Sequence, residues 1–118
     1  MNKVIITGNL TRDPELRYTP QGTAIATFTV ANNEGSKEKK KVCFVEVTAW
    51  DKQAEFINQW FSKGKPILVE GRLQQDVWQD KDSGKNRSKI KITGQRFEFF
   101  GGSGEKKQET AEEISLTE

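Results

Sequence analysis

Residues 42–50 read VCFVEVTAW, and this stretch predicts a β-strand with two dissimilar faces. Because side chains alternate across a strand with period 2, one face carries the small apolar residues Cys43, Val45, Val47 and Ala49. That composition suits the core of a β-barrel. The opposite face carries Val42, Phe44, Glu46, Thr48 and Trp50. A solvated face avoids such rings and a dry core rejects the carboxylate, so we expect the rings to meet a flat partner, a protein or nucleobases.

Four further segments carry strand signals, at residues 4–10, 23–31, 67–78 and 88–93. Trp78 falls on the polar face of its strand, and Ile5 lies opposite the apolar face of the first strand. Gly94 is expected to bend the last segment, so that Phe97 and Phe99 continue in a different phase. The side chains expected to point inward are Val4, Ile6, Leu10, Ala24, Ala26, Phe28, Val30, Ile67, Val69, Leu73, Val77, Ile90 and Ile92.

One helix is predicted between the third and fourth strands. Ala54, Ile57 and Phe61 recur at helical spacing, Asp51 can cap the start, and Gly64 is a stop signal. Three strands, a helix and two strands are the element order of the OB-fold, an all-β, five-stranded Greek-key barrel with one helix. Two alternatives remain. An SH3-like barrel does not need this helix, and a β-sandwich normally has more strands.

Length and charge are consistent with one small domain and a short tail. The 118 residues contain 33% hydrophobic and 31% charged side chains. Residues 1–100 hold 17 basic and 12 acidic side chains, a net charge of +5, whereas residues 101–118 hold 2 and 5, a net charge of −3. A basic body attracts polyanions, although +5 alone is a weak signal. Residues 101–118 begin with GGSG and are expected to be a flexible linker and a disordered acidic tail.

The sequence argues against an enzyme, a metal site and a cofactor. It contains no histidine, one cysteine, and neither a nucleophile elbow nor a phosphate-binding loop. Asp80, Asp82 and Gly84 resemble a calcium loop only faintly, because lysines stand at the later ligand positions, and a β-turn explains them better. With no apolar run of about 20 residues and no secretory leader, the expected location is the cytoplasm.

Three aromatic residues are the candidate binding platforms. In an OB barrel the second and third strands carry the ligand face, and two long hairpins enclose it. Phe44, Trp50 and Trp78 can stack on successive bases without regard to sequence, because every base has a π face. The alternative is that these rings cover an apolar rim or a subunit interface. The other large rings are expected to pack in the core or at the barrel end, namely Phe28, Phe56, Trp60, Phe97 and Phe99.

Basic side chains flank this predicted face from two long connections, at residues 32–41 and 79–87. Any one lysine there is best explained as solvated loop charge. As a set they can neutralise phosphates along a groove. The candidates are Lys37, Lys39, Lys40, Lys41, Arg72, Lys85, Arg87 and Lys89.

Two runs identify a likeness to a known family. DPELRYTPQGTAIATFTVA and the later VEGRL followed by Trp78 occur in the order found in bacterial single-stranded DNA-binding proteins, which the chain resembles over residues 1–100. The resemblance implies an OB-fold, a homotetramer built as a dimer of dimers, and sequence-independent binding of single-stranded DNA during replication, recombination and repair. It also implies a nucleoid-associated cytoplasmic protein, with subunit contacts through the strand that exposes Ile5.

The resemblance assigns particular residues as well. It matches stacking rings to Phe44, Trp50 and Trp78, and basic contacts to Lys3, Arg17 and Lys52. The chain departs from the family pattern at three places. A further stacking ring is replaced near Ser36, Gln74 and Asp76 stand where basic residues are common, and the sequence ends EEISLTE without an acidic Pro-Phe tip. The docking of replication and repair proteins is therefore not carried over.

Two alternative functions use the same fold. One is an adaptor related to the primosomal replication proteins, which works mainly through protein contacts, and the other is an RNA-binding OB module. Phe44 and Trp50 are six residues apart, about 20 Å along a strand, and so should serve different nucleotides. Glu46 lies between them, where a carboxylate would repel phosphate, and the sequence offers no reason for it.

Overall fold

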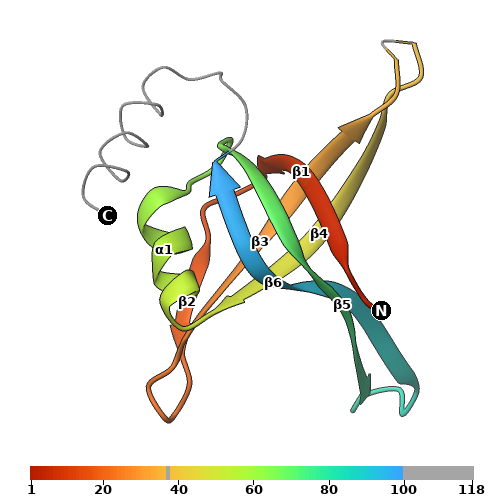
Figure 1. Ribbon diagram of the computed structural model, residues 1–118. Helices are drawn as coiled ribbons and strands as arrows, with labels where there is room; N and C mark the ends of the chain where they lie inside the picture. The colour runs from red at the N-terminus through yellow and green to blue at the C-terminus, as the bar shows by residue number, and fades with distance from the viewer. Residues whose placement is uncertain (37, 100–118) are drawn as a thin grey trace.

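Six strands and one helix are formed by residues 1–36 and 38–99, the part of the chain that a computed structural model describes (Figure 1). The helix α1 (Lys52–Trp60) lies between the fourth and fifth strands. The strands are β1 (Val4–Leu10), β2 (Glu15–Tyr18), β3 (Ala24–Glu34), β4 (Lys41–Trp50), β5 (Pro66–Gln79) and β6 (Asn86–Phe99). The predicted disordered tail lies outside the described residues.

The strand pairing closes into a barrel and confirms the OB-fold. β1 pairs antiparallel with both β3 and β5, β3 pairs with β4, and β5 pairs with β6. A short parallel contact closes the ring, with Val47 opposite Ile92 and Thr48 opposite Thr93. The prediction of five strands missed β2, which pairs with β3 outside the ring. Its four residues contain one half-buried apolar side chain, Leu16, too little for an alternation signal.

The core lies inside the barrel and under α1, which covers one end (Figure 1). Phe61 stacks on Phe99 with ring centroids 5.0 Å apart, and Phe28 meets Phe97 at 6.0 Å. These contacts confirm the packing role predicted for the large rings outside the candidate site. The buried apolar side chains are Leu10, Ala24, Ala26, Phe28, Val30, Val47, Ala49, Ala54, Ile57, Phe61, Ile67, Val69 and Ile92.

A β-bulge changes the phase of β6, as the sequence predicted. Gly71 lies opposite Gly94, but Glu70 lies opposite Arg96, so Gln95 is an extra residue in the ladder. A β-carbon on Gly71 would collide with the backbone carbonyl oxygen of Thr93. Glycine at position 71 therefore permits the close approach of β5 and β6 at the bulge.

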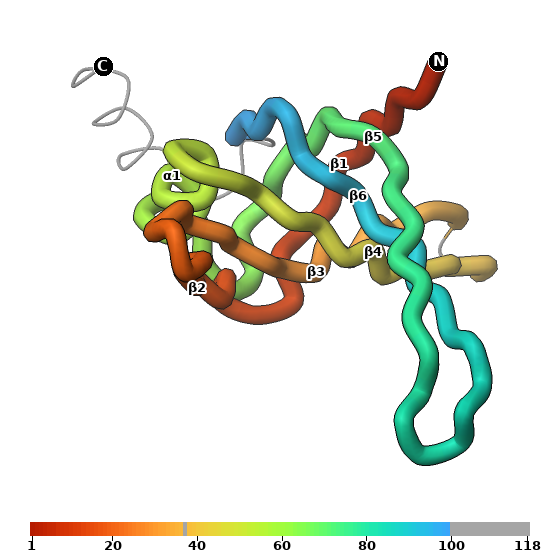
Figure 2. Tube along the Cα trace, turned by 90° about the horizontal axis from the view of Figure 1, so that it is seen from below, coloured from red at the N-terminus to blue at the C-terminus, as the bar shows by residue number. Residues whose placement is uncertain are grey.

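Two hairpins extend beyond the barrel (Figure 2). Several residues that were predicted to lie in the core are therefore exposed on them. Residues 73–91 of β5 and β6, here called the arm, project furthest from α1 (Figure 2). Leu73, Val77 and Ile90 alternate correctly but are exposed, because no segment among the described residues covers the arm. Cys43 is exposed for the same reason on the β3–β4 hairpin. Alternation sets the phase of a strand but not the point at which its barrel ends.

Thr48 is also placed differently from the prediction. It was assigned to the wet face of β4, yet only 4% of it is exposed. Its backbone lies between Thr27 of β3 and Thr93 of β6, so the neighbouring strands crowd its side chain.

The helix starts where predicted but without the predicted cap. Asp51 has φ 60° and ψ −129°, and its side chain makes no capping hydrogen bond. Its backbone N–H instead donates to Ala24 O at 2.7 Å, which ties the β4–α1 connection to β3. Within the described ranges, no helix combines the length and the apolar character that crossing a membrane requires.

Candidate nucleic-acid interface

The outward side of β4 presents two exposed rings, as the sequence predicted. Phe44 is 66% exposed and Trp50 is 46% exposed, although both lie in a regular strand paired with β3. Residues directly opposite each other in an antiparallel pair share one face of the sheet. The register therefore shows which side chains surround each ring.

Cross-strand rows extend from these rings over β2 and β3. Arg17 lies opposite Ile25, which lies opposite Trp50, so the predicted basic contact Arg17 shares a row with this ring. Ala31 lies opposite Phe44. The positions of β2, β3 and β4 in phase with these rings are here called the aromatic face, on which Thr48 alone is buried. They comprise Glu15, Arg17, Ile25, Thr27, Thr29, Ala31, Asn33, Val42, Phe44, Glu46, Thr48 and Trp50.

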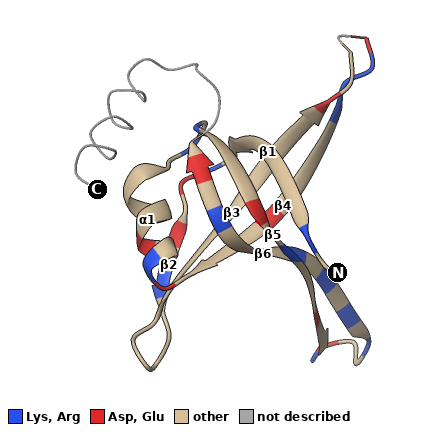
Figure 3. Cartoon of the chain, in the orientation of Figure 1, with Lys and Arg blue, Asp and Glu red and all other residues tan. Residues whose placement is uncertain are grey.

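The third predicted platform lies on the arm. Trp78 is 47% exposed and lies opposite Arg87, with Asp76 opposite Lys89. These residues share the side of the arm that we call the Trp78 side. Basic positions recur along β6 at the arm (Figure 3). Arg72 lies opposite Thr93, just outside the arm.

Each basic residue of β6 on the Trp78 side contacts a carboxylate. Lys91 Nζ lies 2.9 Å from Asp76 Oδ2, and Arg87 Nε donates to Asp80 Oδ2 at 2.9 Å. The hydrogen bond from Lys91 holds the pKa of Asp76 below its ordinary value of 3.8. The Asp82 backbone N–H, and then Arg87, lower the pKa of Asp80. These carboxylates are therefore charged at neutral pH.

A third ion pair, between Glu46 and Lys89, explains the presence of a carboxylate on the aromatic face. The carboxylate of Glu46 contacts the ammonium of Lys89, across from β4 to the arm. Glu46, for which the sequence offered no role, thus connects the aromatic face with the Trp78 side. Its negative charge is compensated by a side chain far away in sequence, which no local pattern reveals.

The remaining predicted basic residues are spread around these surfaces. Lys52 adjoins Trp50 in a shallow hollow of about 460 Å³ that Gln53, Gly94 and Gln95 also line. Lys39 and Lys41 lie on the β3–β4 hairpin and Lys85 precedes β6, whereas Lys37 lies outside the described residues.

The side chain of Lys3 forms an ion pair with a carboxylate of the same chain. It contacts Glu70, which also accepts from Arg96 Nη1 at 3.4 Å. The hydrogen bond and charge of Lys3 lower the pKa of Glu70 from its ordinary 4.5. Lys3 therefore joins β5 and β6 electrostatically to the start of β1.

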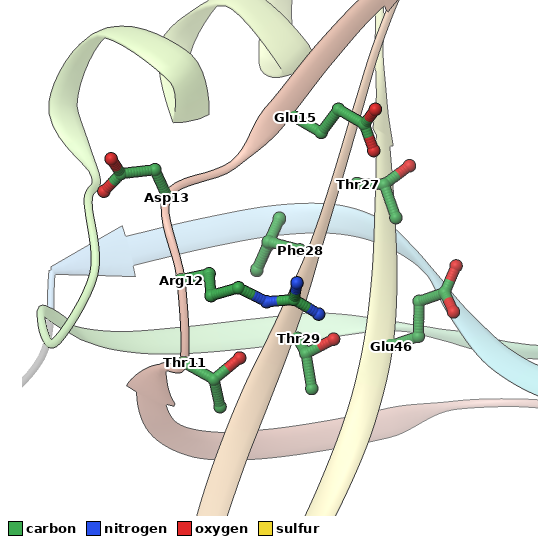
Figure 4. Close-up of a pocket in the computed structure, with 8 residues that line it drawn as sticks. All are labelled: Thr11, Arg12, Asp13, Glu15, Thr27, Phe28, Thr29 and Glu46. Carbon is green, nitrogen blue, oxygen red and sulfur yellow. The ribbon is translucent and has the colours of Figure 1, made fainter.

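The aromatic face contains a hollow of about 510 Å³ that the sequence analysis did not predict (Figure 4). Arg12 extends over it from the connection between β1 and β2 (Figure 4). The alternation of β3 could have identified its floor, since Thr27 and Thr29 are outward positions. No local pattern indicates that Arg12 folds back over that floor. The lining residues are Thr11, Arg12, Asp13, Glu15, Thr27, Phe28, Thr29 and Glu46.

Comparison with known proteins agrees with the barrel fold. A model of the single-strand binding protein family matches residues 1–100. A single-stranded DNA-binding protein from Wolinella succinogenes is 44% identical over 108 residues, which cover 87% of this chain and 66% of that protein. One from Helicobacter hepaticus is 46% identical over 104 residues, covering 84% and 61%. One from Borreliella burgdorferi is 34% identical over 122 residues, covering 99% and 82%.

The chain spans 66% and 61% of the length of the first two relatives, less than two thirds of each. The family match nevertheless covers the whole barrel, from β1 to the end of β6. The chain belongs to the single-strand binding protein family.

Proposed function

We propose that the chain binds single-stranded DNA without sequence specificity, through base stacking on Phe44, Trp50 and Trp78. The observation that carries this proposal is the exposure of all three rings on regular strands, 66%, 46% and 47% respectively. Aromatic rings exposed beside hydroxyls and basic groups are suited to bases, which have apolar faces and polar edges. The names of the relatives, single-stranded DNA-binding proteins, support the same ligand.

Phosphates would be held by the basic side chains around the rings. Arg17 shares a cross-strand row with Trp50, and Lys52 follows Trp50 closely in the sequence. Arg87 lies opposite Trp78. Each phosphate contact releases condensed counterions, so affinity should fall as salt rises. The full proposed set is Lys3, Arg17, Lys39, Lys41, Lys52, Arg72, Lys85, Arg87 and Lys89.

We assign this activity to residues 1–100 and expect the family's roles in replication, recombination and repair, at the nucleoid in the cytoplasm. Binding that tolerates any sequence suits a protein that must coat whatever strand is exposed. The matched range supports this assignment because it contains every proposed contact. Docking of replication and repair proteins through residues 101–118 is a separate question, which a pull-down with and without those residues would answer.

Titration with oligothymidine tests the proposal. Stacking on Trp50 and Trp78 should quench intrinsic tryptophan fluorescence at low salt, and the effect should weaken as salt increases. Trp60→Phe is the matched control, because Trp60 packs against the core at α1 and its removal should leave binding unchanged. Absence of quenching at low salt would contradict the proposal. A parallel titration with oligouridine separates this function from an RNA-binding role.

We further propose that the chain assembles as a homotetramer, a dimer of dimers. Residues 4–8 of β1 pair with β5, whereas β3 reaches only Asn9 and Leu10, so no described strand pairs with the other edge of β1 beside exposed Ile5. Open edges pair readily with another chain. The exposed apolar residues of the arm provide a second surface for assembly.

Light scattering tests the assembly. It should give four times the chain mass of 13.4 kDa, and Ile5→Glu should lower it. A monomer at micromolar concentration would contradict this assembly.

A further inference from the structure

The hollow beneath Arg12 lies between the two rings of the aromatic face. Its floor includes Thr29, which lies opposite Glu46, and Thr27 from the next outward row. The Phe44 row lies immediately on one side of these two rows and the Trp50 row on the other. A strand that stacks on both rings must therefore pass over this hollow.

The spacing of the rings leaves room for a base there. Phe44 and Trp50 are six residues apart on one strand, about 20 Å at the usual rise. Bases in direct contact cannot occupy both rings at that separation. At least one nucleotide between them must lie against something other than Phe44 or Trp50.

Arg12 is held in place on both sides. The N–H of Thr11 donates to Thr29 O at 3.0 Å, and the N–H of Lys63 donates to Asp13 Oδ1 at 2.8 Å. These bonds fix the connection between β1 and β2 against β3 and against the segment after α1. The side chain of Arg12 extends toward Thr29 (Figure 4) and makes no ion pair or hydrogen bond with any described residue.

Charge favours a neutral group over a phosphate in this hollow. Arg12 is the one cation of the lining, against Asp13, Glu15 and Glu46. Lys89 compensates Glu46, but Asp13 and Glu15 have no basic partner among the described residues. A phosphate would meet this excess of negative charge, whereas a base carries no net charge.

We propose that the hollow seats one nucleobase of the bound strand, with the guanidinium plane of Arg12 against the base face. The hydroxyls of Thr27 and Thr29 can then donate to or accept from the polar edge of the base, and the carboxylate of Glu15 can accept from it. Planar guanidinium groups stack on bases as aromatic rings do. This inference rests on the proposed binding of single-stranded DNA and adds a fourth base site, which uses arginine instead of an aromatic ring.

The test compares Arg12→Lys with Arg12→Ala in oligothymidine titrations at several salt concentrations. Lysine keeps the charge but lacks the planar group, so a base seat predicts that both variants lose affinity, by about 3- to 30-fold. The dependence of affinity on salt should stay at the wild-type slope in Arg12→Lys. Arg96→Lys makes the same chemical change at a site paired with Glu70 and Glu98, and should bind like the wild type.

Wild-type affinity in Arg12→Lys, with a shallower salt slope in Arg12→Ala, would identify a phosphate contact and overturn the base seat. Unchanged binding by both variants would overturn it as well. Circular dichroism melting of each variant checks that the barrel is intact. Failure of the wild type itself to bind would instead contradict the proposed function, so the two failures are distinguishable.

Discussion

Asp51 joins β4 to α1 in a backbone conformation that disfavours side chains. Its φ of 60° with ψ −129° lies where glycine is the ordinary residue, and its carboxylate makes no cap. The residue directly follows Trp50, and the N–H of Asp51 is held by Ala24 O. The strained connection thus fixes the end of the strand that presents the ring.

Asp51→Gly should therefore stabilise the protein. Relief of the strain exceeds the greater entropy that glycine loses on folding, and we expect a gain of about 0.5–1 kcal/mol in the free energy of unfolding. Urea denaturation at fixed protein concentration measures it. Asp51→Ala is the control, since it removes the carboxylate but retains the β-carbon, and it should give no gain. Equal stabilisation by both variants would show that the carboxylate is the cause.

Removal of an exposed ring should weaken DNA binding without unfolding the barrel. Trp50→Ala and Trp78→Ala should each cost about 1–3 kcal/mol of binding free energy, because each deletes one stacking platform. Fluorescence anisotropy with a labelled oligothymidine measures this loss. Phe44→Ala should behave in the same way, whereas Trp60→Phe should not. Wild-type affinity in all three ring variants would mean that the strand takes another path.

At the scale of elements, the three basic residues on the Trp78 side of the arm are each paired with a carboxylate, two from the arm and one from β4. Lys89 and Lys91 are already in contact with Glu46 and Asp76. Ion pairs at the surface contribute little stability, about 0–1 kcal/mol, and each of these has one partly exposed partner, so a phosphate can displace a carboxylate. The displaced carboxylate then repels the phosphate beside it. The pairs should therefore limit the affinity of the arm for a polyanion.

Glu46→Gln should accordingly raise the affinity for single-stranded DNA. Lys89 becomes available for a phosphate, so the plot of log affinity against log salt should steepen by about 0.7. Glu98→Gln is the control, because Glu98 contacts Arg96, which keeps Glu70 as a partner. An equal gain in both variants would show that net charge alone is responsible. Unchanged affinity in Glu46→Gln would place the DNA away from Lys89.

The sequence predicted the elements well because each strand reports its own alternation. The inward phase of β3 and the outward position of Phe44, Trp50 and Trp78 follow from period 2 alone. The end of the barrel could not be predicted, because exposure of Ile90 depends on what other strands cover. The Glu46 pair and the Arg12 hollow depend on contacts between distant segments, and no spacing along the chain encodes those.

At the scale of the whole molecule, one charge cluster ties three strands or their ends together. Glu70 of β5 contacts Lys3, just before β1, and Arg96 of β6. Lys3 and Arg96 favour the charged form of this carboxyl and lower its pKa from 4.5. A carboxyl with a lowered pKa in the folded state adds stability above its unfolded pKa, and that contribution is lost as pH falls through the folded pKa.

Below pH 4.5 the free energy of unfolding should therefore decline, in part because Glu70 becomes protonated. Glu70→Gln should be less stable than the wild type at pH 7 and should show a weaker dependence on pH in the acid range. Urea denaturation from pH 3 to pH 7 measures both. Glu55→Gln, at a carboxylate that no described basic side chain contacts, should retain the wild-type dependence. The same weakening in both variants would exclude Glu70 as the source.

The path of the DNA over the molecule is tested most directly by photocross-linking. An oligothymidine substituted with bromouracil would be bound to the full chain, irradiated and digested, and the linked peptides identified by mass spectrometry. The proposed path predicts cross-links at Phe44, Trp50 or Trp78. Cross-links confined to α1, at Phe56 or Trp60, would contradict it.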